Sequence, residues 1–200
     1  MMSIVTTGAE TGYYVDVFRS RKEKGGDKMH DYFYHNLGQT LTLTAADGSD
    51  LNLQSTEELA FAGAHLYAYS YLYDKKVAAT NKDVKATFTI DMKDKDGDDI
   101  YMNLWMKGEP DREVFTALAP MTEGLSRTPN MPYNIKEQPT LTFVARQHGE
   151  AWNRPFVSIY EPSTKKEPSA IQSVSYFDAE GAGLEDFAGI CVKGSYLLSI

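Results

Sequence analysis

Two histidines, His30 and His35, have the clearest potential for metal or acid–base chemistry, and they lie in the stretch "YYVDVFRSRKEKGGDKMHDYFYHNLG" at residues 13–38. An imidazole ligates zinc through a neutral ring nitrogen and exchanges protons near neutral pH. An odd separation along a β-strand, however, places two side chains on opposite faces. No cluster of cysteines or carboxylates completes a site around either ring. We therefore expect no metal and no catalytic role here, and predict that both histidines form hydrogen bonds or line a binding groove.

The acidic run "DMKDKDGDD" at residues 91–99 resembles a calcium loop in composition. With Gly97 at the sixth position of an EF-hand loop, the first and twelfth positions fall on Met92 and Asn103, which lack the required carboxylates. We predict an acidic turn between two strands. The sequence also lacks a phosphate-binding loop, a dinucleotide fingerprint and a nucleophile elbow, so no cofactor and no catalytic residue is predicted.

Aromatic and guanidinium side chains that could bind a saccharide gather in the second half of the chain. Arg127 lies in the proline-rich segment 117–139, and Trp152 and Arg154 lie in the turn "HGEAWNRPF". An aromatic face stacks on a sugar ring, and a planar guanidinium binds carboxylate or sulfate. We predict that these three side chains share one face for an acidic oligosaccharide. The alternative is that Trp152 anchors the turn and Arg154 pairs with Glu150.

A basic patch is the second candidate for contact with an anionic ligand. It contains Arg19, Arg21, Lys22, Lys24 and Lys28. Its alternative interpretation is a solvated loop, because short charge runs usually serve solubility. The net charge of −8 and the pI near 5.0 disfavour nucleic acid as a partner. An acidic polysaccharide would need a local basic patch, so Arg19 is retained as a candidate ligand-binding residue.

The elements that must position these residues read mostly as β-strands, because apolar and polar side chains alternate along them. Strands are expected within residues 12–20, 31–54, 65–74, 84–92, 99–108, 139–149, 154–162, 170–178, 187–194 and 195–200. Within residues 31–54 a strand pair is expected to turn at Asp47-Gly48. One short helix is possible at residues 55–63, "STEELAFAG".

About ten short strands without sustained helical periodicity predict an all-β fold, an antiparallel β-sandwich of two packed sheets with at most one short helix. At 200 residues the chain, 1–200, fits one such domain. The single cysteine, Cys191, lies in the apolar run "AGICVKG" and is expected to be a buried thiol. No stretch reaches the roughly 18 apolar residues of a membrane span, and no signal peptide is recognisable at the start, so no membrane partner is expected.

The opening stretch is similar to a segment of the heparinase II/III-like polysaccharide lyases. The matching residues are Tyr14, Val15, Asp16, Phe18, Arg19, Gly25, Gly26, His30, Tyr32 and His35. A later strand that ends in Glu161-Pro162, followed by a strand that ends in an aromatic residue, resembles the closing strands of the same family. The resemblance implies that residues 13–38 form two strands of a sheet joined by a basic Gly-Gly turn.

Members of that family combine an α-helical toroid with a C-terminal β-sandwich that carries a zinc and a catalytic histidine. The family's histidine-x-histidine and histidine-asparagine-threonine motifs do not occur in this sequence. The resemblance therefore implies a C-terminal sandwich module that is inactive alone and supports β-elimination on uronic-acid polysaccharides when joined to its toroid.

Partners and location follow from the same resemblance. The expected partners are an acidic polysaccharide and either the missing toroid or a second copy of the chain. The implied location is periplasmic or secreted. A free-standing β-sandwich protein that binds carbohydrate or another surface is the alternative, and a helical toroid in the neighbouring coding sequence would distinguish the two.

Overall fold

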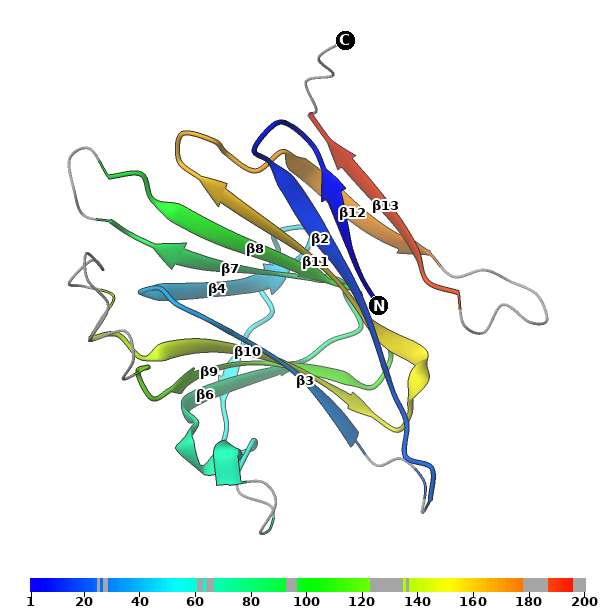
Figure 1. The fold of residues 1–200 in the computed structure, drawn as a ribbon. Coiled ribbons are helices and arrows are strands. Elements are labelled where there is room, and N and C mark those ends of the chain that lie inside the picture. The colour runs from blue at the N-terminus through cyan, green and yellow to red at the C-terminus, as the bar shows by residue number, and fades with distance from the viewer. Residues whose placement is uncertain are drawn as a thin grey trace.

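The computed structural model of the chain describes residues 1–24, 26, 29–60, 63, 67–92, 97–122, 135, 137–177 and 187–195. These residues form two large antiparallel sheets, which face each other as layers, and a third small sheet (Figure 1). The predicted all-β sandwich is therefore confirmed. No helix among the described residues is long and apolar enough to cross a membrane.

The first large sheet has six strands in the order β1-β2-β11-β8-β7-β4. Their bounds are β1 (Met2–Thr6), β2 (Gly12–Ser20), β11 (Ala151–Thr164), β8 (Ile100–Met106), β7 (Val84–Ile90) and β4 (Thr40–Ala45). Strands β7 and β8 pair antiparallel, as the sequence predicts. Residues 93–96 of the acidic turn between them lie outside the described residues.

The second large sheet has five strands in the order β3-β10-β9-β6-β5. Their bounds are β3 (Met29–Asn36), β10 (Thr140–His148), β9 (Arg112–Ala119), β6 (Tyr73–Ala79) and β5 (Gln54–Ser55). A short 3-10 helix, η1 (Tyr67–Tyr71), precedes β6. It lies beside this sheet, at the lower end of the molecule in Figure 1.

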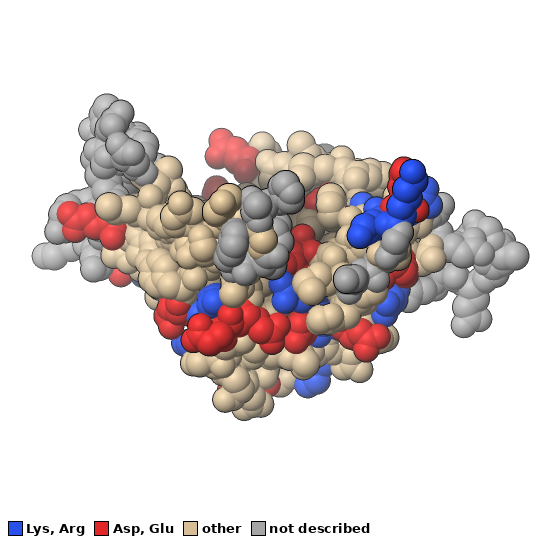
Figure 2. Space-filling model, turned by 90° about the horizontal axis from the view of Figure 1, so that it is seen from below, with Lys and Arg blue, Asp and Glu red and all other residues tan. Residues whose placement is uncertain are grey.

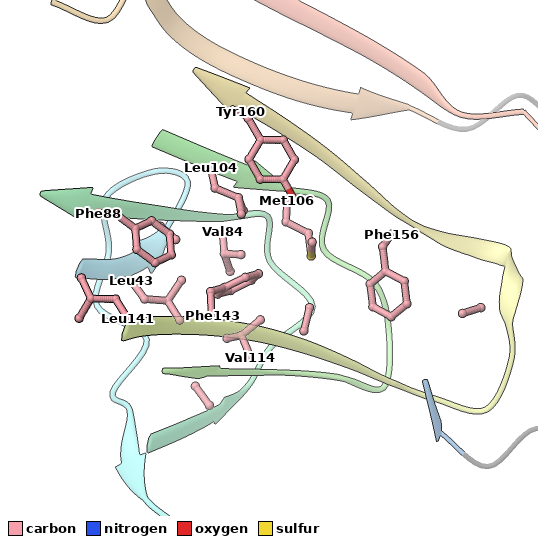
Figure 3. Close-up of a cluster of buried hydrophobic side chains, with 14 residues drawn as sticks. Leu43, Val84, Phe88, Leu104, Met106, Val114, Leu141, Phe143, Phe156 and Tyr160 are labelled. Carbon is pink, nitrogen blue, oxygen red and sulfur yellow. The ribbon is translucent and has the colours of Figure 1, made fainter. Parts of the chain in front are cut away.

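The main core fills the space between the two large sheets. On β7, Val84, Ala86 and Phe88 are buried while the alternate residues are less so, because successive side chains point to opposite faces. Phe143 from β10 and Phe156 from β11 meet this row from the two sheets (Figure 3). Burying each large apolar side chain stabilises the fold by about 1.5–3 kcal/mol.

A third sheet, formed by β12 (Ile171–Phe177) and β13 (Gly189–Gly194), covers the outer face of the six-stranded sheet. Val174 of β12 packs with Trp105 and Ile159 from that sheet in a second apolar cluster. The sequence predicts the strands but not this additional layer. Its consequence is that the six-stranded sheet is buried on both faces over part of its width.

The expectation of a buried Cys191 is wrong, because the thiol is exposed. Strand β13 belongs to an outer layer with only one covered face. Ile190 and Val192 pack toward the six-stranded sheet, so the intervening Cys191 points to solvent.

The expectation that residues 13–38 form two paired strands of one sheet is also wrong. Strand β2 belongs to the six-stranded sheet and β3 to the five-stranded sheet. Tyr32 and Tyr34 of β3 pack into the core between the sheets, and the Tyr32 hydroxyl reaches Asp16 of β2 at 2.9 Å. The two strands therefore meet through side chains across the sandwich and not through backbone hydrogen bonds.

Two further element predictions, the strand pair about Asp47-Gly48 and the strand at residues 65–74, are wrong. Asp47-Gly48 does form a turn, with Gly48 at φ 84°, but β4 pairs with β7 while β5 pairs with β6. The strand expected at residues 65–74 is instead η1 followed by β6. Alternating tyrosines mimic a strand there, whereas Tyr69 and Leu72 share one buried face because a 3-10 helix repeats every third residue.

The short helix expected at residues 55–63 does not form over its described residues. Thr56 accepts a hydrogen bond from the backbone nitrogen of Glu58 at 3.0 Å, which makes a local turn and not a helix cap. Leu59 then takes a positive φ of 54° and is buried against the five-stranded sheet. Burial of this one leucine, and not local helix propensity, decides the path of the segment.

Candidate functional site

The turn that carries Trp152 connects β10 of the five-stranded sheet to β11 of the six-stranded sheet. Gly149 adopts a φ of 81° at its tip. The Glu150 carboxylate accepts hydrogen bonds from the backbone nitrogens of Trp152 at 2.7 Å and Asn153 at 2.8 Å. Trp152 is therefore fixed within the first residues of β11. The sequence had suggested that it lies in a turn.

Two arginines, one in β2 and one just after it, contact Trp152. The Arg19 guanidinium donates a hydrogen bond to the Trp152 carbonyl oxygen, and the Arg21 guanidinium carbon lies 4.3 Å from the centre of the indole ring. A hollow of about 410 Å³ adjoins them, lined by Met1, Val17, Phe18, Arg19, Trp152 and Ala188. We call the unit of Arg19, Arg21 and Trp152 the basic turn. It combines an aromatic surface with two guanidinium groups.

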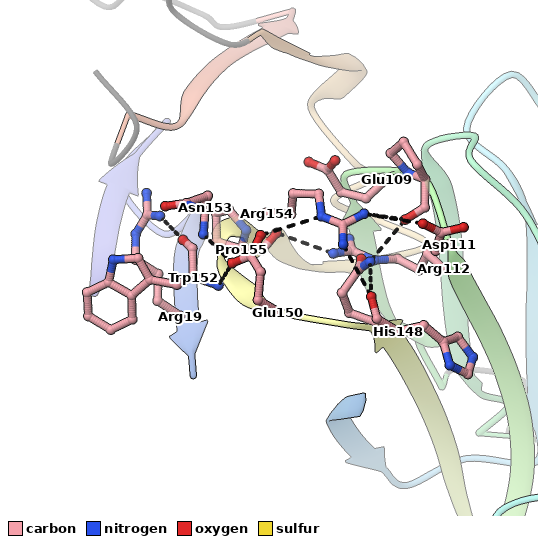
Figure 4. A network of polar contacts seen from close by, with 12 residues as sticks. Arg19, Glu109, Asp111, Arg112, His148, Glu150, Trp152, Asn153, Arg154 and Pro155 are labelled. Carbon is pink, nitrogen blue, oxygen red and sulfur yellow. Dashed lines mark hydrogen bonds and ion pairs between the residues drawn. The ribbon is translucent and has the colours of Figure 1, made fainter. Parts of the chain in front are cut away.

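Arg154 does not join the basic turn. Its guanidinium donates hydrogen bonds to the carbonyl oxygens of Pro110 at 3.1 Å and His148 at 3.2 Å. It also lies 3.6 Å from carboxylate oxygens of both Asp111 and Glu150. Figure 4 shows Arg154 directed away from Trp152, toward Asp111. These contacts include the predicted pairing of Arg154 with Glu150.

Arg127, the remaining member of the predicted saccharide site, lies outside the described residues. Sequence reasoning placed Arg21 only in the basic patch and did not connect it with Trp152. The two residues belong to different strand ends, and only the pairing of β2 with β11 brings them together.

The two predicted histidines point to opposite faces of β3. His30 shares the inner face with Tyr32 and Tyr34, whereas His35 shares the outer face with Asp31 and Phe33. The Nδ1 atom of His35 lies 2.9 Å from the Thr142 hydroxyl. Its ring stacks against Phe33 and loses water there, and this desolvation lowers the pKa of His35 below its ordinary value of 6.5. The two imidazoles therefore cannot act on one ligand.

An ion-pair cluster that sequence reasoning missed lies next to His35 on this outer face. Asp31 binds Arg146 through two hydrogen bonds of 2.7 and 2.8 Å. The Tyr69 hydroxyl donates a third hydrogen bond to Asp31 at 2.6 Å. The only sequence signal was the alternation of Asp31, Phe33 and His35 along one face of a predicted strand.

The tyrosines at the inner face of β3 do not have the properties of catalytic bases. Burial raises the pKa of Tyr32 to about 12, and burial likewise raises the pKa of Tyr34 to about 12. The Tyr32 hydroxyl contacts Asp16 at 2.9 Å and Ser158 at 3.3 Å, and it also contacts Tyr160. Both hydroxyl groups stay neutral near pH 7. The Tyr32 hydroxyl donates to Asp16, whereas the Tyr34 hydroxyl accepts a hydrogen bond from the Asn36 side-chain amide at 3.2 Å.

Within the described part of the chain, no three or more histidine, cysteine, aspartate or glutamate side chains come together in a way that could hold a metal ion.

Comparison with known proteins finds an enzyme whose sequence is similar to this chain. An endo-acting ulvan lyase from Formosa agariphila is 34% identical to the chain over 178 residues. The chain is homologous to part of a polysaccharide lyase. The match covers 87% of this chain but only 20% of the lyase, so the chain spans about a fifth of that protein. No family model matches the chain, and membership of the heparinase II/III-like family stays a prediction.

Proposed function

We propose that the chain is the C-terminal β-sandwich module of a heparinase II/III-like polysaccharide lyase and that it binds acidic polysaccharide without cleaving it alone. The observation that carries this proposal is the 34% identity to an endo-acting ulvan lyase over most of the chain. The fold agrees with it, because the described residues form an antiparallel β-sandwich. Joined to an α-helical toroid, the module would support β-elimination, in which a base removes the proton beside the uronic acid carboxylate.

The basic turn is the proposed contact with the acidic polymer. Arg19 and Arg21 supply guanidinium groups, which bind carboxylate and sulfate well. The indole of Trp152 supplies an apolar face beside them. The chain carries a net charge of −8, so attraction of an anionic polymer has to come from a local basic surface of this kind.

Titration calorimetry with ulvan tests the proposal. The whole chain should bind ulvan and should not bind uncharged dextran, and binding should weaken as salt screens the charges. Trp152→Ala and Arg21→Gln should each raise the Kd about tenfold, which corresponds to about 1.4 kcal/mol. Lys166→Gln is the matched control, since it removes an exposed positive charge beyond the opposite end of β11 and should leave the Kd unchanged.

Cleavage is measured in the same samples. β-Elimination creates a carbon–carbon double bond conjugated with the uronic acid carboxylate, and this product absorbs ultraviolet light. The chain alone should produce no rise in that absorbance with ulvan. A rise that disappears in His30→Ala or His35→Ala would contradict the proposal, as would ulvan binding that all of the basic-turn variants retain.

The proposed protein partners are the toroid or a second copy of the chain. Strand β1 pairs with β2 along one edge, and its other edge pairs with no described strand. Its side chains Met2 and Ile4 are 66% and 70% exposed. Exposed apolar residues on an open sheet edge favour association with another polypeptide.

A further inference from the structure

A groove on the outer face of the five-stranded sheet lies far in the fold from the basic turn. Its volume is about 570 Å³, which is the size range of small-molecule sites. Its lining residues come from β3, η1 and the end of β9 and are Asp31, Phe33, His35, Ala68, Tyr69, Tyr71, Leu72, Ala119 and Pro120. The hollow beside the basic turn is lined by Val17 and Arg19 of β2, which belongs to the other large sheet.

The walls of the groove are aromatic and fixed by mutual contacts. Phe33 and Tyr69 meet edge to face with ring centres 5.3 Å apart. The His35 ring lies at 28° to that of Phe33, with ring centres 5.9 Å apart. Tyr71 is 63% exposed at the rim, so its ring is accessible to a ligand. Aromatic walls of this kind accept the apolar C–H face of a sugar ring.

The polar groups of the groove accept hydrogen bonds and carry negative charge. Asp31 lines the groove, and its partner Arg146 also lies 3.4 Å from a Glu58 carboxylate oxygen, so two carboxylates face one guanidinium. No lysine or arginine is among the described residues that line the groove. Figure 2 shows a band of acidic side chains across this side of the molecule, with the larger group of basic side chains at one edge. An anionic ligand is therefore disfavoured here.

His35 offers a second acceptor. The Nδ1 atom of His35 lies 2.9 Å from the Thr142 hydroxyl, which is itself 3.4 Å from the Thr140 carbonyl oxygen. With that hydroxyl donating to the carbonyl, the neutral imidazole would donate its Nδ1–H to the hydroxyl oxygen. In the neutral imidazole the proton on Nδ1 leaves Nε2 with a free electron pair. A sugar hydroxyl is a suitable donor to that nitrogen.

We propose that this groove binds an uncharged sugar ring. The ring would stack its apolar face on Tyr71 and Phe33 and donate hydroxyl hydrogen bonds to Nε2 of His35 and to the Asp31 carboxylate. The inference rests on the proposed function in that it adds a second glycan contact to the module. It differs in ligand chemistry, because the basic turn selects acidic groups and the groove selects neutral ones.

Saturation-transfer NMR on the whole chain tests the groove with two probes, methyl β-D-glucopyranoside and the charged methyl β-D-glucuronide. Because the basic turn would itself bind a carboxylate, the two probes are compared in the Trp152→Ala variant, where the glucoside should receive saturation and the glucuronide much less. Tyr71→Ala should weaken glucoside binding about fivefold or more, because it removes one stacking surface. Tyr67→Ala is the matched control, since Tyr67 and Tyr71 are 64% and 63% exposed on the same η1 but only Tyr71 lines the groove.

The outcomes separate this proposal from the proposed function. Trp152→Ala should leave glucoside binding unchanged, and Tyr71→Ala should leave the Trp152-dependent part of ulvan binding in place. Absence of glucoside binding, an equal response to the glucuronide in the Trp152→Ala variant, or an equal effect of Tyr67→Ala and Tyr71→Ala would overturn the groove site. Loss of ulvan binding to the basic turn would overturn the proposed function and leave the groove proposal standing.

Discussion

Asp31 and Arg146 carry opposite charges that are largely removed from water, with side chains 8% and 9% exposed. Breaking such a pair leaves a charge that is buried without a partner. We predict that Asp31→Asn lowers the free energy of unfolding by about 3 kcal/mol, measured by urea denaturation. Asp111→Asn is the control. Asp111 is 73% exposed and 3.6 Å from its arginine, so its effect should stay within about 0.5 kcal/mol.

His35 makes stability depend on pH. Its pKa is lowered in the folded state, so the unfolded chain binds a proton more readily as the pH falls through 6.5. Stability from this group is present above the unfolded pKa and is lost below it. The urea midpoint should therefore decrease from about pH 7 to about pH 5, and His35→Ala should reduce the part of the decrease that belongs to this residue. An NMR titration in which His35 shows an unchanged or raised pKa would contradict this.

Trp152 shows how far a residue-level interpretation of the sequence can reach. The sequence identified Trp152 and Arg19 as candidates from their chemistry, yet it grouped Trp152 with Arg154. The structure directs Arg154 to Asp111 and brings Arg21 to Trp152 instead. Spacing along the chain could not decide this, because a tight turn and the pairing of β2 with β11 determine which side chains meet.

At the scale of elements, the chain crosses between the two large sheets after β3, and Gly38 makes this crossing possible. Its φ is 145°, and an added Cβ would lie 2.5 Å from the Thr89 carbonyl oxygen. Gly38→Ala should cost about 3 kcal/mol of stability through strain and backbone clash. Gly48 also has a positive φ, 84°, but open space around it. Gly48→Ala should therefore lower the free energy of unfolding by only about 1 kcal/mol. Equal losses in the two variants would show that close packing at Gly38 is unimportant.

The elements that the sequence predicted well are those with strict alternation, such as β7 and β2. Alternation reports which side chains share a face, but it does not report which strand is the neighbour. β2 and β3 were therefore assigned to one sheet although they face each other across the core. The Asp31–Arg146 pair was beyond sequence reasoning for the same reason, since 115 positions separate its members along the chain.

At the scale of the whole molecule, the open edge of β1 predicts self-association. We expect sedimentation velocity to show a dimer that increases with concentration. Ile4→Lys should shift the chain to monomer, because a charge on an edge strand opposes pairing with another strand. Met121→Lys, which replaces an apolar residue that is 59% exposed elsewhere on the surface, should leave the dimer unchanged. A chain that remains monomeric at every concentration tested would contradict the proposed association.

The central claim is that the chain recognises acidic polysaccharide through the basic turn. Backbone amide chemical-shift mapping of the isotope-labelled chain, titrated with ulvan oligosaccharides, tests it most directly. The account predicts saturable shifts centred on Arg19, Arg21 and residues 150–153, which become smaller at high salt. Shifts that are absent, or that concentrate on other faces while the basic turn stays unperturbed, would contradict it.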